Sequence, residues 1–269
     1  MKKMFLRVLA FAFDMFFVSA IVYGLSNISF LNPNKGEITQ YYQELEEIKN
    51  EYDDIESKMD EYLLDNVIDA TEYGEIRDNY HFFVNDFYDI EQGETFDDDT
   101  KNNLVNSIED SYNTYTKEYN YNINKLNVES GIVTLIVYIL YFGVLEWYLK
   151  GQTIFKKLFR LRTISLDGKD IPLWKFIIKG ILITEAIFTI LNIIFVNCLG
   201  VDAYTIFSNI MYYIEFVYEV VFVIACIIRD DQRSVHDLLL NTRIALYDKN
   251  NKEVESILFK DEEDINKVN

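Results

Sequence analysis

Residues 4–28 read MFLRVLAFAFDMFFVSAIVYGLSNI, an apolar run that carries one arginine and one aspartate. At 1.5 Å per residue, a helix of this length crosses a hydrocarbon core of about 30 Å. Three further apolar runs lie at about 131–149, 176–198 and 206–228. Because these runs are continuous rather than alternating, they predict membrane-spanning helices and not the strands of a barrel. We therefore expect an all-α protein with four transmembrane helices, and its 10 Gly and 2 Pro agree with a largely helical chain.

An acidic block separates the first apolar run from the second. From Phe30 to Glu129 the chain has 7 Lys or Arg and 26 Asp or Glu, a net charge of −19 that equals the charge of the whole protein. Apolar and aromatic residues recur there every three or four positions, which is typical of amphipathic helices, for example at Leu45, Ile48, Tyr52, Ile55 and Met59. We therefore expect a helical hairpin or a three-helix bundle over residues 32–129.

Two features of this block allow a structural and a binding interpretation. The acidic run at Asp97, Asp98 and Asp99 precedes Thr100, which is typical of the start of a helix, although the same carboxylates could bind a cation. The tyrosine stripe is expected to be core. The net charge of the block either attracts a basic partner or forms a solvated surface.

The basic residues predict the orientation of the spans in the membrane. Lys2, Lys3 and Arg7 flank the start of the first run, and the segment between the second and third runs contains seven basic residues between 150 and 175. The loop near Asn197–Tyr204 has no basic residue. We therefore expect a multi-pass protein of the cell membrane, with both termini cytoplasmic and residues 32–129 extracytoplasmic. Asp14 interrupts the first run, so a cleaved signal peptide is not expected.

Several classes of function are disfavoured by the composition. A pI near 4.5 without a basic patch outside the membrane flanks argues against nucleic-acid binding. Two Cys and two His are too few ligands for a zinc site, and we expect no cofactor. No G-x-S-x-G nucleophile motif is present, so an enzyme is not expected.

Carboxylates inside the apolar runs are the sharpest functional signal. Asp14, Glu185 and Glu219 each lie about ten residues from a flanking basic residue, which corresponds to a depth of about 15 Å, near the bilayer midplane. Glu215 lies one helical turn from Glu219 and would extend the same face. Lys179 and Arg7 are expected to reach the headgroups, and Glu146 is expected to be interfacial. Without a basic neighbour, these acids must hold a proton or a cation.

Two functions remain open on this evidence. The carboxylates could form a proton or sodium pathway in a small transporter, or they could hydrogen-bond neighbouring helices as structural groups. In the second case the protein would be a membrane-anchored scaffold whose acidic block binds a partner. Four spans are few for a transporter, so we expect a homo-oligomer or a membrane complex in contact with the lipid bilayer.

The ends of the spans resemble the RDD family of bacterial membrane proteins, which is named for one arginine and two aspartates. The matching positions are Arg7, Asp14 and Asp237, together with the loop from Gly151 to Arg162. Phe155, Arg160 and Asn241 stand where the family often has glycine, although Asn tolerates a positive φ. Some members are associated with sodium/proton antiport or other transport, so the resemblance implies a transport function.

The expected organisation has four parts. Residues 1–31 form the first transmembrane helix, residues 32–129 the acidic insertion, residues 130–248 an RDD-like membrane domain with three transmembrane helices and a basic cytoplasmic loop, and residues 249–269 a cytoplasmic tail. Adjacent helical residues point apart, so His236 and Asp237 are not expected to act as a catalytic pair. Instead we expect Asp237 to form a salt bridge with Arg160 or Arg162.

Overall fold

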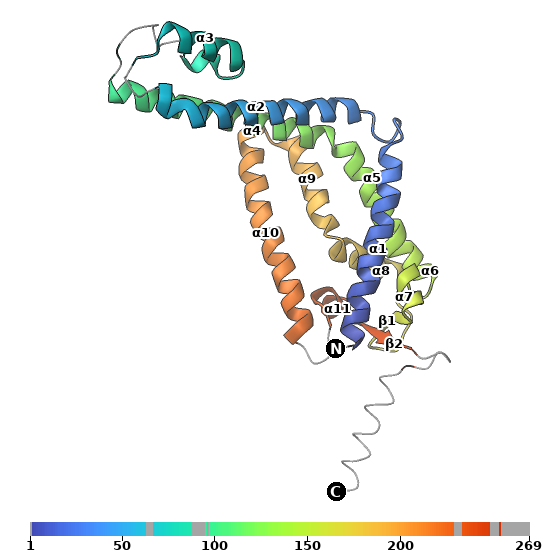
Figure 1. The fold of residues 1–269 in the computed structure, drawn as a ribbon. Helices are drawn as coiled ribbons and strands as arrows, with labels where there is room; N and C mark the ends of the chain where they lie inside the picture. The colour runs from blue at the N-terminus through green and yellow to red at the C-terminus, as the bar shows by residue number, and fades with distance from the viewer. Residues whose placement is uncertain are drawn as a thin grey trace. The chain divides into compact units, whose positions relative to one another are not determined.

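The computed structural model describes residues 2–62, 67–87, 95, 97–228, 233–247 and 253. The chain divides into two compact units (Figure 1). The membrane unit contains Met1–Asn32, Val128–Phe195 and Phe207–Asn269, and the acidic unit contains Pro33–Asn127 and Val196–Ile206. Of the tail expected at 249–269, all but Glu253 lies outside the described residues.

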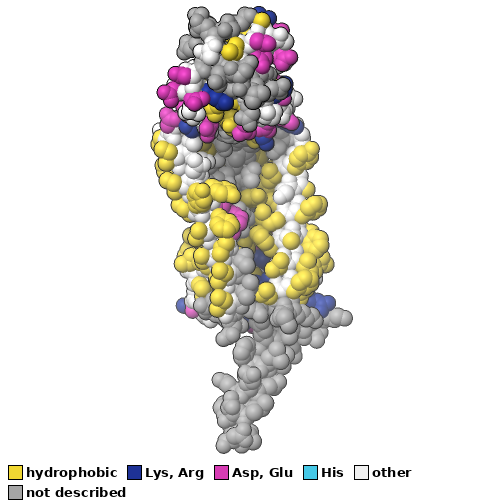
Figure 2. Space-filling view, turned by 60° about the vertical axis from the view of Figure 1, so that its left-hand side comes forward, with side chains coloured by type: hydrophobic (Ala, Val, Ile, Leu, Met, Phe, Trp, Pro, Cys, Tyr) yellow, Lys and Arg dark blue, Asp and Glu magenta, His cyan; other side chains and the backbone are white. Residues whose placement is uncertain are grey.

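The membrane unit consists mainly of helices, several of which are long and apolar. Its elements are α1 (Lys2–Ser26), α5 (Val128–Tyr138), the π-helix η2 (Ile139–Leu145), α6 (Glu146–Tyr148), α7 (Ile154–Leu158), β1 (Leu161–Ser165), α8 (Leu173–Ile183), α9 (Ala186–Cys198), α10 (Val201–Ile228), α11 (Val235–Leu239) and β2 (Thr242–Leu246). Figure 2 shows hydrophobic side chains spread over the surface of these long helices, whereas acidic side chains gather on the acidic unit. An apolar surface of this kind is suited to contact with lipid.

Two stretches of helix among the described residues are long and apolar enough to cross a membrane, namely Met4–Ser26 and Val128–Tyr148. A third candidate is the pair α8 and α9, if the two helices are counted as one span. The sequence predicted one continuous helix here, but the two helices meet at an angle of 77°. The break falls at Glu185, whose φ of +57° is left-handed and therefore ends α8. The fourth expected span corresponds to α10, a single helix of 28 residues that is not counted among these candidates.

Close packing of α8 against η2 depends on two glycines. A Cβ atom at Gly180 would lie 3.1 Å from the Cβ of Phe142, and a Cβ atom at Gly143 would lie 3.2 Å from the Cα of Ile177. Small residues allow helix backbones to approach each other in membranes, where van der Waals packing stabilises association. These glycines therefore bring the polar residues of α8 close to α6.

Two short strands were not expected in an all-α protein. β1 pairs antiparallel with β2, so that Leu161 lies opposite Leu246 and Ser165 lies opposite Thr242. In the basic segment before β1, the short helix α7 ends at Leu158. Arg160 follows with a left-handed φ of +59°, which stops the helix and turns the chain into the strand.

The acidic unit consists of α2 (Lys35–Tyr62), α3 (Ala70–Asn79), η1 (Val84–Phe87) and α4 (Asp98–Leu126). The long helices α2 and α4 pack together, and the tyrosines expected to be core do pack against the buried cluster, as the stacked rings of Tyr52 and Tyr112 show. Asp97 accepts a hydrogen bond from the backbone N–H of Thr100 at 2.9 Å, which confirms its interpretation as a helix cap. The short loop near Leu199 belongs to the same unit, because Tyr121 donates a hydrogen bond to the Leu199 carbonyl at 3.1 Å.

Arg160 and Asn241 both adopt the left-handed backbone that glycine favours, with φ of +59° and +56°. The expectation that Asn241 accommodates a positive φ is therefore confirmed. Arg160 has an exposed side chain and a Cβ atom that disfavours this conformation by about 1–2 kcal/mol.

We predict that Arg160→Gly raises the free energy of unfolding by about 1 kcal/mol, because glycine adopts this φ without a steric penalty. Arg160→Ala is the matched control, since it removes the same side chain but keeps the Cβ atom. Thermal unfolding of the detergent-solubilised protein measures both variants. Equal midpoints for the two variants would contradict the prediction.

Candidate functional site

A buried salt bridge joins the first helix of the membrane unit to its last. Arg7 of α1 donates a hydrogen bond to Oδ2 of Asp237 in α11 at 2.9 Å. Asp237 is completely buried, and it also accepts hydrogen bonds from the hydroxyl groups of Ser234 at 2.9 Å and Thr242 at 3.1 Å. Burial by itself would raise the pKa of Asp237, but the positive charges of Lys179 and Arg7 outweigh it and hold the pKa well below its usual range.

Lys179 of α8 connects this salt bridge to a second one. Its Nζ lies 3.5 Å from Oδ1 of Asp237 and 3.9 Å from Oε1 of Glu146, and it donates a hydrogen bond to the Thr163 hydroxyl at 2.8 Å. The same carboxylate oxygen of Glu146 accepts hydrogen bonds from Lys156 at 2.8 Å and from the Thr163 hydroxyl at 2.6 Å. Lys179 is only 2% exposed, so both of these contacts are shielded from solvent.

Asp14 of α1 forms the third acidic position of this region. Tyr141 donates a hydrogen bond to its Oδ1, and the Thr153 hydroxyl donates one to its Oδ2 at 2.5 Å. The backbone N–H of Phe155 also points to Oδ1 at 3.4 Å, and Lys156 interacts with the carboxylate electrostatically. Asp14 is completely buried, so its polar contacts all come from the protein.

The basic and acidic residues of this region are equal in number, so their formal charges balance. The buried ion-pair network contains three basic residues, Arg7, Lys156 and Lys179, and three acidic residues. Glu146 and Asp237 form ion pairs with these basic residues, whereas Asp14 interacts with Lys156 only by electrostatics beyond ion-pair distance. Its members come from α1, α6, α7, α8 and α11, and Thr163 adds β1. Removing charges from water costs several kcal/mol per ion unless they are paired and hydrogen-bonded. The network meets that condition and holds these elements together.

Several sequence expectations are corrected by this geometry. Asp237 pairs with Arg7 and Lys179, and not with Arg160 or Arg162. Arg7, Lys179 and Glu146 were expected at the headgroups; their depth in the membrane stays a prediction, but all three have charged partners within the protein that were not expected. Their depth was counted along straight helices from the nearest basic residue, and that count takes no account of partners from distant segments.

The four carboxylates expected to bind a proton or cation divide into two groups. Asp14 lies in the buried ion-pair network, so the expectation that it has no basic neighbour is wrong. Glu185 instead interacts electrostatically with Glu219 and Glu215, which lie one turn apart on α10. Among the described residues no ion pair reaches these three glutamates, and no three acidic, histidine or cysteine side chains are arranged to hold a metal ion.

His236 is buried beside the network without adding a charge to it. Ser234 has a single hydroxyl hydrogen, which is directed to Asp237, so Nε2 of His236 donates to the Ser234 hydroxyl across 2.8 Å. Nδ1 is then an unprotonated acceptor, and it has no hydrogen-bond partner among the described residues. Burial lowers the pKa of His236 to about 3, so the ring is neutral at physiological pH.

Sequence reasoning missed the residues that complete the network. Lys156, Thr163 and Tyr141 were not singled out, because nothing in their local sequence distinguishes them from a basic or aromatic membrane flank. Lys179 and Glu146 did carry a signal, since each is an ionisable residue within or beside an apolar run. Treating that pair as mutual partners would have identified the centre of the network.

Comparisons with known proteins give one finding. The model of the RDD family matches residues 104–241, which is more than half of the chain and includes every described element from α5 to α11. The matched range contains Glu146, Lys156, Lys179 and Asp237, and it begins within α4 of the acidic unit. No curated protein and no solved structure gives a significant match.

We predict that Arg7→Met lowers the free energy of unfolding by about 3–5 kcal/mol, because it leaves Asp237 buried and short of a partner. Lys58→Met is the control, since Lys58 forms an exposed salt bridge with Asp54 at 3.1 Å and should contribute less than about 1 kcal/mol. Thermal or denaturant unfolding in detergent measures both. A loss for Arg7→Met as small as that for the control would contradict a stabilising network.

We predict that His236 makes the protein less stable in mild acid. Its folded pKa is about 3 and its ordinary value is 6.5, so below pH 6.5 the unfolded chain binds a proton that the folded chain does not. Stability should therefore fall as pH decreases from 7 to 5, by up to about 1.4 kcal/mol per pH unit from this group. His236→Gln should reduce the difference in unfolding midpoint between these pH values. His81→Gln, at an exposed position of the acidic unit, should leave it unchanged.

Proposed function

The chain belongs to the RDD family, and we propose that it is a multi-pass membrane protein that handles a proton or a sodium ion at Glu185, Glu215 and Glu219. It is an integral membrane protein by its family and its apolar helices. The observation that carries the proposed ion handling is the interaction of these three glutamates within apolar helices and at a helix break.

The balance of charges distinguishes the glutamates from the buried acids. Asp14, Glu146 and Asp237 are equal in number to Arg7, Lys156 and Lys179, and these six residues form the buried ion-pair network described above. A carboxylate at the bilayer centre costs about 2.5–3.5 kcal/mol on insertion scales, and neighbouring carboxylates repel one another. The glutamates therefore need a proton or a cation, and a proton requires no coordination cage.

The helix break supports the same proposal. Broken helices in membranes occur where backbone is buried in protein or lines a polar cavity, and transporters use them to build binding sites. The break places Glu185 between α8 and α9, where Tyr218 of α10 donates a hydrogen bond to the Leu182 carbonyl at 2.7 Å. This contact holds the end of α8 beside the helix that carries Glu215 and Glu219.

The proposed topology follows the distribution of basic residues. Four spans, with α10 as the last, would put both termini and the basic segment between α6 and α8 in the cytoplasm, and the acidic unit outside the cell membrane. Glu219 lies on an exposed part of α10. Because an ionised side chain facing lipid is costly, this position favours a second copy of the chain packed against α10.

A scaffold function is the second candidate, and the acidic unit is the observation that favours it. This unit has its own buried cluster, which includes Ile48, Phe83 and Ile108, and it carries nearly all of the surplus negative charge. An independently packed acidic surface is suited to a basic partner. In this case the three glutamates would contribute only to the association of the helices.

We predict that Glu185→Gln and Glu219→Gln each reduce proton- or sodium-driven flux by roughly tenfold or more, because the amide cannot exchange a proton or balance a cation. The assay uses the full chain in sealed vesicles that contain a pH-sensitive dye. Flux is driven by an imposed sodium gradient in one arm of the experiment and by an imposed potassium gradient in the other. Glu118→Gln, on the exposed face of α4, removes one negative charge from the acidic unit and should leave flux unchanged.

Variants are compared only where their unfolding midpoints match that of the unaltered protein. Unchanged flux in both membrane variants would overturn ion handling at these glutamates and leave the scaffold function. Loss of flux in the sodium arm alone would identify sodium as the ion, whereas loss in both arms would identify the proton.

A further inference from the structure

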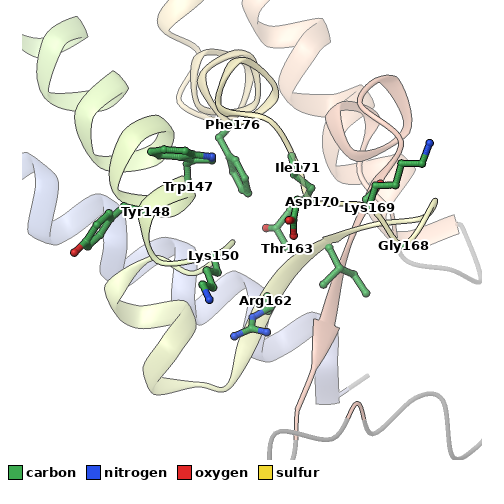
Figure 3. Close-up of a pocket in the computed structure, with 12 residues that line it drawn as sticks. Trp147, Tyr148, Lys150, Arg162, Thr163, Gly168, Lys169, Asp170, Ile171 and Phe176 are labelled. Carbon is green, nitrogen blue, oxygen red and sulfur yellow. The ribbon is translucent and has the colours of Figure 1, made fainter.

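A cavity of about 620 Å³ opens beside the end of the second apolar span, within the membrane unit (Figure 3). Its walls come from five segments: the end of α6, the turn before α7, strand β1, the loop that leads to α8, and α8 itself. The cavity is separate from the three glutamates, none of which lines it. Its volume is in the range that holds a small ligand or a lipid headgroup.

The charge of this cavity is predominantly positive. Lys150, Arg162 and Lys169 line it, with Asp170 as the one acidic residue in its described lining. Lys150 and Arg162 lie on the same side of the cavity, whereas Lys169 points outward at its rim (Figure 3). Two basic side chains from separate elements can therefore approach one ligand.

Arg162 has unused hydrogen-bond donors within the described part of the chain. No described residue accepts a hydrogen bond from its guanidinium group, and its Nε is buried without a partner. The guanidinium lies 5.2 Å from the centre of the Tyr247 ring, a distance at which a cation and an aromatic ring attract each other. A guanidinium with unused donors can bind a phosphate group through two parallel hydrogen bonds.

The alternation of β1 explains this arrangement. Leu161 and Thr163 are buried, and Thr163 donates to Glu146 of the ion-pair network. Because successive side chains of a strand point to opposite faces, Arg162 is directed away from that network. It is therefore not needed to balance the buried charges.

The aromatic residues at the cavity mark the depth of a headgroup. Trp147 and Tyr148 end the Val128–Tyr148 span, line the cavity and are 44% and 74% exposed. Trp174, at the start of α8, is also exposed. Tryptophan and tyrosine are enriched at membrane interfaces, where their rings lie at the level of the headgroups. Ile164, Ile171 and Phe176 add apolar wall next to these charges.

From this geometry we propose that the cavity binds the phosphate of an anionic phospholipid. Arg162 and Lys150 hold the phosphodiester, and the apolar wall contacts the glycerol and the first methylenes of the acyl chains. Asp170 is available to accept hydrogen bonds from headgroup hydroxyl groups. The negative surface potential of a leaflet rich in anionic lipid attracts basic residues such as these to the headgroups.

The test measures the thermal unfolding midpoint of the full chain in neutral detergent as lipid is added. Phosphatidylglycerol should raise the midpoint in a saturable manner, while phosphatidylcholine of the same acyl chains and inorganic phosphate should not. Arg162→Gln should raise the phosphatidylglycerol concentration needed for half of the shift by roughly tenfold or more, as the loss of a bidentate guanidinium–phosphate contact implies. Lys150→Gln should raise it severalfold.

Arg160→Gln is the matched control, because it removes a neighbouring exposed basic residue that does not line the cavity. Equal effects of Arg160→Gln and Arg162→Gln would reduce the interaction to general charge attraction and overturn the proposal. Equal stabilisation by phosphatidylcholine, or by inorganic phosphate, would overturn the lipid assignment. If Arg162→Gln fails to fold, Lys150→Gln carries the comparison, since Lys150 is exposed and its replacement disturbs no buried contact.

Discussion

The contact between Lys179 and two carboxylates is the constraint around which the membrane unit is arranged. Its ammonium group lies between Asp237 and Glu146, and each of these acids has its own second basic partner in Arg7 or Lys156. An unpaired lysine would be costly in this buried position, and a single ion pair would need excellent geometry to offset the loss of hydration. Because these charges meet in one place, α1, α8 and α11 are held together by ion pairs as well as by packing.

This arrangement gives the membrane unit two groups of acidic residues with different consequences. In the network, every carboxylate has hydrogen-bond donors and a nearby positive charge, so its protonation would break contacts. Glu185, Glu215 and Glu219 have only one another among the described charged residues, so a change in their protonation breaks no described salt bridge. The glutamates lie outside the network, with Glu185 at the break between α8 and α9 and with Glu215 and Glu219 on α10.

The parts of the fold that depend on local patterns could be predicted from the sequence. Continuous apolar runs located α1 and the helix that ends at Tyr148, and the spacing of Ile48, Tyr52 and Ile55 identified the core face of α2. The contacts that depend on distant segments could not. Strand β1 is too short to be recognised without β2, and Asp237 gives no local indication that its partner is at position 7. The break at Glu185 also has no glycine or proline to mark it.

The salt bridge between Arg7 and Asp237 also has a consequence for folding during synthesis of the chain. The two residues are separated by 230 positions, so the arginine leaves the ribosome roughly 10–50 s before its carboxylate at ordinary rates of translation. During that interval the first helix must enter the bilayer with an unmatched guanidinium at its edge and with Asp14 lacking Tyr141. The ion pair of Arg7 can therefore form only after the last segment of the membrane unit has emerged, and a chain truncated before residue 237 lacks it.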